Sequence, residues 1–406
     1  MTPKSAVYFP GLNGIRALAA ILVIVCHIDE WSYRFGLTST DYYKRLMGAY
    51  AVVMFFVLSG FLITYLLIKE KEKYGTISYR KFYTRRILRI WPVYYIVLFV
   101  GAFLVIYFSS QLWHSRNIYV TFLFYFLMVP NLVHNFGYKA DVFGVLWSIG
   151  AEEQFYAFWP FIIKNSRIII RSVLILLCLY LAMKFILTTQ VQSSIKFHKW
   201  LHFVSFDYMA VGAIAAWLYH KKHRILSILY HPVTQAICWL FLLVSIFHEP
   251  IHIPILPSFD QNYHAVVYAI IILNVGTNPK TLVSLENSLC NFLGKLSYGI
   301  YAYHFIVLFI LSLTVKDYLG YIESDLLKRA VMFALAIGGT VLVSYLSYTY
   351  VESWFLEKKE KFMLIRSSTT RASAENSEVF SDQIVVSSNL IVNNARLAEK
   401  SKPIDN

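Results

Sequence analysis

Charged residues are scarce in this sequence: they make up 15% of its 406 residues, whereas 58% are hydrophobic. A soluble domain of ordinary composition carries about a quarter charged residues. With so little charge the chain cannot cover its own surface in water, which excludes a soluble globular protein. Apolar runs long enough to cross a hydrocarbon core recur along the chain, which excludes a single membrane anchor. We therefore predict an all-α, polytopic membrane helix bundle.

Cysteine is also scarce, and no two cysteines have the spacing of a zinc site or a CxxC motif. The four are Cys26, Cys178, Cys238 and Cys290. All fall within or beside apolar stretches, where cysteine behaves as a small buried apolar residue. We therefore expect no metal site.

Acidic residues are outnumbered, because 23 Asp and Glu stand against 37 Lys and Arg, for a net charge of +14. Much of the excess lies between Lys69 and Arg89, with an apolar run on either side. Cations in a short loop between two spans are typical of the cytoplasmic side of a membrane protein. Membrane topology therefore explains the charge, and we expect no nucleic-acid partner.

Eleven apolar runs are candidate spans. They are Gly14–Ile28, Met47–Ile68, Ile90–Ser109, Ile118–Val133, Phe143–Ile163, Ile168–Leu187, Phe203–Tyr219, Val233–Phe247, Ala265–Val275, Leu296–Val315 and Ala330–Tyr350. No small-residue cleavage site follows the first run, which predicts a retained helix rather than a signal peptide.

The number of crossings must be even, because both ends of the chain look cytoplasmic. The amino end is short, and Lys358, Lys359 and Lys361 follow the last run. We predict about ten transmembrane helices, with Ile118–Val133 as a re-entrant or pocket-packed segment, since irregular backbone at membrane depth must be shielded by protein. Whether that run crosses is left open.

Two parts of the chain differ in composition. Residues 1–365 are predicted to form the membrane domain, in the cell inner (cytoplasmic) membrane with both termini in the cytoplasm. Residues 366–406 are polar and lack periodicity, which predicts a disordered cytoplasmic tail. We expect no further hydrolase-like domain in this polar stretch.

Arg16 and His27 are ionisable residues within the first apolar run, where charge is costly and therefore points to function. Eleven residues correspond to three helical turns plus about 20°, with a rise of about 16 Å. Both therefore share one helix face, with Arg16 near the inner surface and His27 near mid-membrane. A snorkelling arginine and a hydrogen-bonded buried histidine would give the same pattern.

Glu152 and Glu153 are adjacent carboxylates in another apolar run, and on a helix they point about 100° apart. At least one of them must face the protein interior, where a carboxylate can orient an imidazole. The alternative is that the pair lies at the outer surface in water.

Arg85, Arg86 and Arg89 precede a third span, and Arg85 and Arg89 share a helix face. Guanidinium groups suit phosphate oxygens, so a phosphorylated donor from the cytosol would meet them first. Anchoring by positive charge is the alternative, although lysine would serve that purpose equally well.

At these and neighbouring residues the sequence closely resembles acyltransferase family 3, the integral-membrane O-acyltransferases that acetylate bacterial surface polysaccharides. The matching blocks are Leu12–His27, Phe55–Ile63, Phe82–Tyr94, Trp147–Tyr156, Leu293–His304 and Ser344–Glu352. They extend over about Phe9 to Phe355. The family's acidic pair favours Glu152 over Glu153, whereas Asn13 departs from the usual aspartate.

The resemblance implies transfer of an acyl group, most often acetyl, from cytosolic acyl-CoA to a hydroxyl of an extracytoplasmic carbohydrate, with no bound cofactor besides this donor. It implies His27 as general base, Glu152 as its orienting group and Arg16 as a stabiliser of the oxyanion. The implied substrate-binding residues are Arg85, Arg86, Arg89, Trp147, Ser148, Glu153 and Tyr156.

The expected partners are membrane lipid, acyl-CoA and a glycan acceptor. A transporter or flippase of a polar lipid-linked glycan intermediate is the alternative function, and the lack of a visible internal repeat argues against it. The acceptor, the acyl chain, a covalent intermediate and the oligomeric state are left open.

Overall fold

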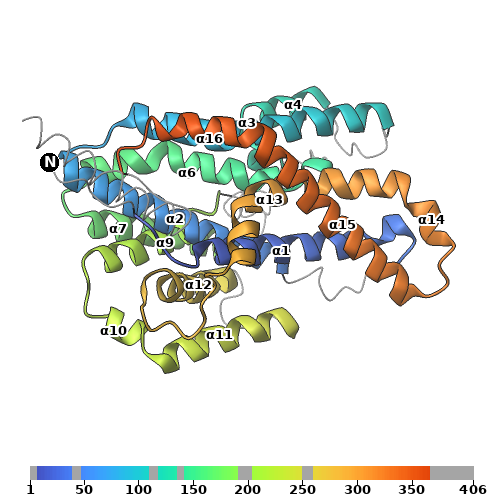
Figure 1. Cartoon of the computed structure of the whole chain (residues 1–406). Coiled ribbons are helices and arrows are strands. Elements are labelled where there is room, and N and C mark those ends of the chain that lie inside the picture. The colour runs from blue at the N-terminus through green and yellow to red at the C-terminus, as the bar shows by residue number, and fades with distance from the viewer. Residues whose placement is uncertain are drawn as a thin grey trace, which may run out of the picture.

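The computed structural model of the chain describes residues 7–38, 47–108, 118–134, 141–190, 204–248 and 259–365. Within these ranges the chain forms a bundle of helices, so the predicted helical membrane bundle is confirmed in outline (Figure 1). Six helices of the described part are long and apolar enough to cross a membrane. The predicted tail, 366–406, lies outside the described residues.

The longer helices follow the apolar runs. They are α1 (Leu12–Glu30), α2 (Met47–Tyr74), α3 (Tyr79–Phe108), α6 (Leu146–Asn165), α7 (Ile169–Gln190), α9 (Phe206–His220), α11 (Pro232–Phe247), α12 (Asp260–Thr277), α13 (Ser288–Thr314) and α15 (Asp325–Ser347). Shorter elements connect or extend them: η1 (Ser32–Phe35), α4 (Ile118–Phe126), α5 (Pro130–His134), η3 (Asp141–Phe143), α10 (Leu226–Leu229), α14 (Lys316–Gly320), η5 (Tyr348–Glu352) and α16 (Ser353–Glu360).

The run Ile118–Val133 is divided between α4 and α5, as an interrupted segment would be. Met128 adopts a left-handed conformation with φ 59°, and Pro130 begins α5. The nine residues of α4 extend about 14 Å, roughly half of a 30 Å hydrocarbon core. Neither piece is therefore long enough to cross alone.

Protein groups satisfy the backbone at this break. The hydroxyl of Tyr94 donates to the carbonyl of Tyr125 at 2.6 Å, and the hydroxyl of Tyr95 donates to that of Phe126 at 3.0 Å. These bonds from α3 give the last turn of α4 the shielding that irregular backbone needs in a membrane.

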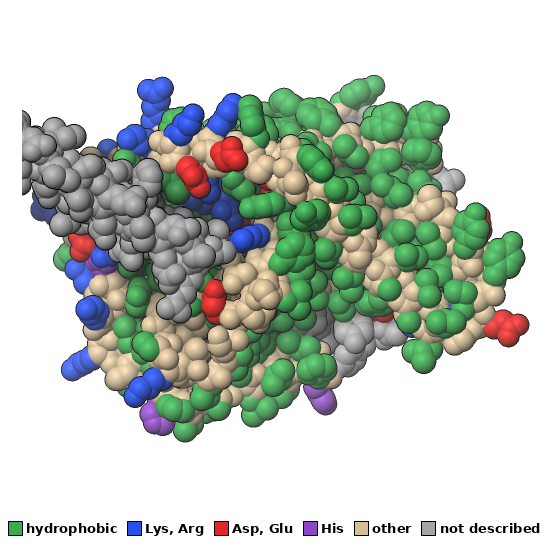
Figure 2. All heavy atoms as spheres, in the orientation of Figure 1, with side chains coloured by type: hydrophobic (Ala, Val, Ile, Leu, Met, Phe, Trp, Pro, Cys, Tyr) green, Lys and Arg blue, Asp and Glu red, His purple; other side chains and the backbone are tan. Residues whose placement is uncertain are grey.

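Basic side chains gather at one end of the bundle, at the left of Figure 2, and we call this the basic end. Contacts between helix termini show which ends of the helices lie together there. The backbone amide of Gly11, which precedes α1, donates to Glu286, just before α13, at 2.6 Å. Lys71 near the end of α2 donates to the carbonyl of Ile163 near the end of α6 at 2.8 Å.

The opposite termini meet at the other end of the bundle. Lys184, late in α7, pairs with Asp207 at the start of α9 at 3.2 Å and donates to Asn262 at the start of α12 at 2.8 Å. Arg329 of α15 lies 3.8 Å from Asp29 near the end of α1. The helices therefore alternate in direction along the bundle.

Two helix pairs position the site. α1 and α13 run parallel: Asn13 bonds Asn291 at 3.0 Å near their starts, and His27 contacts His304 further along both helices. α2 and α9 cross with their backbones in close approach at Gly60, where an added Cβ would collide with the Met209 backbone. Small residues at a crossing permit this kind of packing in membranes.

Candidate functional site

A cavity of about 220 Å³ opens among α1, α2, α3, α6, α13 and α16 near the basic end, and we call it the arginine cavity. Its charged lining residues are Arg16, Arg85, Arg86, Arg89, Lys359, Glu70 and Glu152. Five cations against two carboxylates leave an excess of positive charge. A polyanion such as a phosphorylated ligand would neutralise it.

The three arginines of α3 differ in their surroundings. Arg85 pairs with Glu70 at 3.3 Å and donates to the Phe362 carbonyl at 3.0 Å, so it is already engaged. The Arg86 guanidinium lies over the ring of Tyr156 at 5.5 Å, and its buried Nε has no hydrogen-bond partner among the described residues. Arg86 is therefore the arginine best placed to receive a new anion.

Arg16 belongs to the same cavity. Its guanidinium donates to the side-chain oxygen of Asn13 at 3.1 Å, one turn closer to the basic end. This orientation places Arg16 with the arginines of α3. Eleven residues and about 16 Å of rise separate it from His27, so the two side chains do not meet at one reacting atom.

Glu152 also lies in the arginine cavity, where its partner is a tyrosine. Its carboxylate accepts from the Tyr156 hydroxyl at 3.3 Å, and that hydroxyl also forms a short hydrogen bond with Ser59 of α2. Among the described residues the contacts of Glu152 do not include His27. The reason is position: Glu152 faces α2 and α3, whereas His27 lies at the far end of α1.

His27 occupies the last turn of α1, and its partner is a second histidine. Its Nδ1 lies 3.1 Å from Nε2 of His304, and the two rings stack with centroids 5.0 Å apart. Nε2 of His27 is 3.9 Å from a carboxylate oxygen of Glu30. The imidazole is 19% exposed.

The hydrogen bonds define the tautomers of this imidazole pair. Nδ1 of His304 lies 2.8 Å from the carbonyl oxygen of Tyr301, which can only accept, so this nitrogen donates. In neutral His304 the Nε2 then accepts, and Nδ1 of His27 must be the donor. The lone pair of His27 is therefore on Nε2, as a general base requires.

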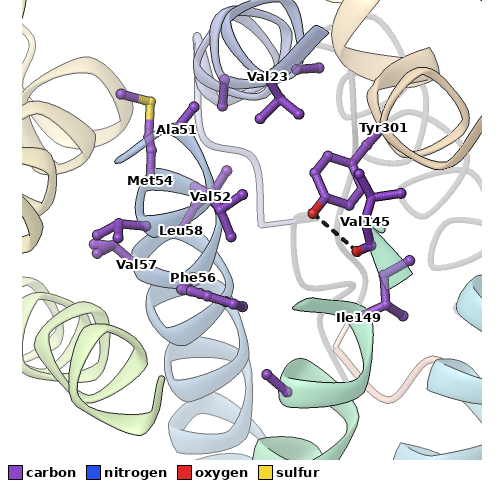
Figure 3. Packing of buried hydrophobic residues seen from close by; sticks show 14 of the residues in the cluster. Val23, Ala51, Val52, Met54, Phe56, Val57, Leu58, Val145, Ile149 and Tyr301 are labelled. Carbon is purple, nitrogen blue, oxygen red and sulfur yellow. Dashed lines mark hydrogen bonds between the residues drawn. The ribbon is translucent and has the colours of Figure 1, made fainter. Parts of the chain in front are cut away.

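The arginine cavity ends short of the imidazole pair. Its far lining includes Phe55 and Tyr301, whose rings lie 5.7 Å apart, and His27 is not among the lining residues. Figure 3 shows Val23, Val52 and Tyr301, from three helices, directed toward one another, with the Tyr301 hydroxyl bonded to the Val145 carbonyl at 3.2 Å. Arg16 therefore lines the arginine cavity, whereas His27 lies beyond its far lining.

The remaining predicted residues divide between the cavity and its surroundings. Ser148 lines the cavity and bonds the Tyr301 hydroxyl at 2.6 Å. Trp147 lies outside the lining and packs edge-on against Phe56 at 6.1 Å. Glu153 also lies outside and accepts from the Trp91 indole at 3.4 Å.

Sequence reasoning overlooked Ser59, Lys359 and His304 as site residues. Ser59 and His304 are polar groups within apolar runs, which is the same signal that selected His27. In the sequence Lys359 belongs to a basic cluster after the last run, which indicates membrane topology rather than a site. Only the packing of α16 against α3 brings it to the cavity.

A family model described as an acyltransferase domain matches residues 9–349 of the chain. Among curated proteins, "Putative peptidoglycan O-acetyltransferase YrhL" of Bacillus subtilis (strain 168) is 28% identical over 368 residues, which are 85% of this chain and 54% of that protein. "Peptidoglycan O-acetyltransferase OatA" of Listeria monocytogenes (serovar 1/2a, strain ATCC BAA-679 / EGD-e) is 26% identical over 376 residues, 87% of this chain and 56% of the relative.

A third relative is a "Putative O-acetyltransferase" of Staphylococcus aureus (strain MRSA252), 24% identical over 384 residues, 90% of this chain and 60% of that protein. The chain thus spans a little over half the length of these curated relatives. Comparison with solved structures gave no match.

Proposed function

The chain belongs to the acyltransferase domain family, and on that premise we propose that it transfers an acetyl group from acetyl-CoA to a hydroxyl of a carbohydrate across the membrane in which it is embedded. The observation that carries the proposal is the arginine cavity, with its five cations against two carboxylates at the basic end. The phosphates of a cytosolic CoA ester suit this lining. The relatives named as peptidoglycan O-acetyltransferases support a glycan acceptor.

We propose ten crossings by α1, α2, α3, α6, α7, α9, α11, α12, α13 and α15. The alternating helix termini and the gathering of basic residues at one end support this topology, with the basic end in the cytoplasm. The pieces α4 and α5 then pack at the outer side without crossing. In this arrangement residues 1–365 form the membrane domain, and both termini are cytoplasmic.

The donor enters the arginine cavity from the cytoplasmic side. Arg86 and Arg89, with Arg16, hold the diphosphate that joins its nucleotide to its thioester arm, while Glu152 and Ser59 keep the Tyr156 ring under the Arg86 guanidinium. The thioester end then points away from the basic end, toward Tyr301. His304 lies three residues beyond Tyr301 on α13, which is less than one helical turn and a rise of about 4.5 Å.

Acyl transfer takes place at the imidazole pair. Nε2 of His27 accepts the proton of the acceptor hydroxyl, whose oxygen bonds to the thioester carbonyl carbon. The C–S bond then breaks, and the CoA thiolate accepts this proton from His27. His304 is a positioning residue here, because it fixes the tautomer of His27. The side chains of Phe55 and Tyr301 must separate for the thioester to arrive.

A gradient-free assay distinguishes this proposal from the alternative of a transporter or flippase. The purified chain in nanodiscs is given [¹⁴C]acetyl-CoA and a soluble glycan oligosaccharide. An enzyme moves label to the acceptor, or slowly to water, without an ion gradient or a second compartment. A carrier leaves all label on CoA, and that result would remove the proposal.

A further inference from the structure

We infer that a second cavity at the basic end binds the 3′-phosphorylated adenosine end of the acyl-CoA donor, an inference that rests on the proposed function. This cavity has a volume of about 480 Å³ and lies among α2, α9, α10 and α12. We call it the adenosine cavity. Lys69, Lys222, Arg224, His223, Tyr65 and Tyr230 are among its lining residues.

The charge of the adenosine cavity suits a phosphate monoester. Its lining holds three cations and, among the described residues, no carboxylate. Lys69 is balanced by Glu72 at 3.1 Å, whereas Lys222 and Arg224 form no ion pair in the described part of the chain. Two uncompensated cations match the two negative charges of a 3′-phosphate.

The backbone at Lys222 is a second, independent observation. Lys222 has φ 49°, in the left-handed region, and terminates α9 in a Schellman motif. In this motif the amide of His223 donates to the Leu218 carbonyl at 3.0 Å and the amide of Lys222 donates to that of Tyr219 at 3.1 Å. Glycine is the usual residue at this position, because a side chain there is strained. A strained lysine that lines a cavity points to a use for its ammonium group.

Size and position connect the two cavities. Small-molecule sites usually enclose about 300–1,000 Å³, so the arginine cavity alone is too small for a whole CoA ester. A single aromatic wall separates the two: the ring of Phe9, which lines the arginine cavity, lies 5.1 Å from Tyr65 and 5.8 Å from Tyr219. One donor can therefore place its thioester arm in one cavity and its nucleotide in the other, with adenine against the tyrosine rings.

The test measures binding of two nucleotide fragments to the purified full-length chain in detergent. Adenosine 3′,5′-bisphosphate carries the 3′-phosphate, and adenosine 5′-monophosphate lacks it. Lys222→Gly should weaken bisphosphate binding about tenfold and monophosphate binding by less than twofold. Because glycine relieves the strain, the unfolding midpoint should stay level or rise. Arg224→Gln should give the same loss, and Lys221→Gln, an exposed cation in the same turn, should give none.

Three results would overturn the inference. Equal losses for both fragments would mean that no 3′-phosphate is bound, and a lower unfolding midpoint in Lys222→Gly would mean that the lysine is structural. A loss of activity that follows the phosphatidylglycerol content of nanodiscs, with fragment binding unchanged, would identify a lipid headgroup as the occupant. Failure of the wild-type chain to transfer acetyl would count against the proposed function, and the fragment measurements would still decide the cavity.

Discussion

Replacing His304 by alanine tests the tautomer argument without removing the proposed base. The change deletes the 3.1 Å hydrogen bond between the two imidazoles, which in this argument fixes the proton on Nδ1 of His27. A buried donor that loses its partner costs about 1–3 kcal/mol, which corresponds to a fall in kcat of roughly 5- to 150-fold. The KM for acetyl-CoA should change little, because His304 does not line the arginine cavity.

The assay is steady-state transfer from [¹⁴C]acetyl-CoA, with the unfolding midpoint recorded for each variant. His304→Gln keeps a side-chain acceptor and should recover part of the lost rate. His264→Ala is the control for a general loss of packing, because it removes another buried histidine that lines neither cavity. The Nδ1 of His264 lies 2.7 Å from the Asp260 carbonyl oxygen. If His304→Ala keeps kcat within twofold, or changes KM alone, the tautomer argument is refuted.

Two further variants test the donor site and the packing beneath it. Arg86→Gln should raise the KM for acetyl-CoA about 10- to 100-fold with a smaller effect on kcat, because charged hydrogen bonds contribute about 1.5–3 kcal/mol. Arg167→Gln, which changes an exposed arginine, is the control. An unchanged KM in Arg86→Gln would contradict the assignment. Gly60→Ala should lower stability by about 1–3 kcal/mol, since the new Cβ meets the backbone of α9. The measurement is the unfolding midpoint. Gly338→Ala in α15, where a Cβ meets nothing, should leave it level or raise it, because alanine is the better helix former.

The helices could be predicted from the sequence because lipid imposes a local requirement. Each span needs a long apolar run whatever its neighbours are. Ten of the eleven predicted runs therefore correspond to one long helix each, and the exception is Ile118–Val133. The parity of crossings also singled out Ile118–Val133 as a re-entrant or pocket-packed segment. The residue that breaks the helix, Met128, has no such signal of its own, because glycine is the usual residue at a left-handed helix C-terminus. Here the amide of Val129 donates to the Phe124 carbonyl at 3.0 Å and closes the end of α4.

The membership of the site could be predicted only in part. Arg16, the α3 arginines and Glu152 meet in one cavity, as polar groups in apolar runs should. Which polar groups meet each other depends on helix pairing, and the sequence does not contain the register of α1 against α13. That register gives His27 the partner His304. Glu152 instead accepts from Tyr156, one turn further along the same helix, α6.

The sequence also could not predict that the arginine cavity and the imidazole pair are separate. Periodicity places Arg16 and His27 on one face of α1, but the space between them is decided by side chains of other helices. Phe55 and Tyr301 close the far end of the cavity from α2 and α13.

His27→Gln gives the most direct test of the central claim, that an imidazole at the end of α1 catalyses acetyl transfer. Glutamine keeps hydrogen-bonding capacity but cannot accept the acceptor's proton. Purified wild-type and variant chains are compared for transfer of label from [¹⁴C]acetyl-CoA to a glycan oligosaccharide, with equal unfolding midpoints as the folding criterion. The account predicts a loss of about 10²- to 10⁴-fold in kcat with the KM for donor preserved. Transfer by folded His27→Gln at the wild-type rate would contradict it.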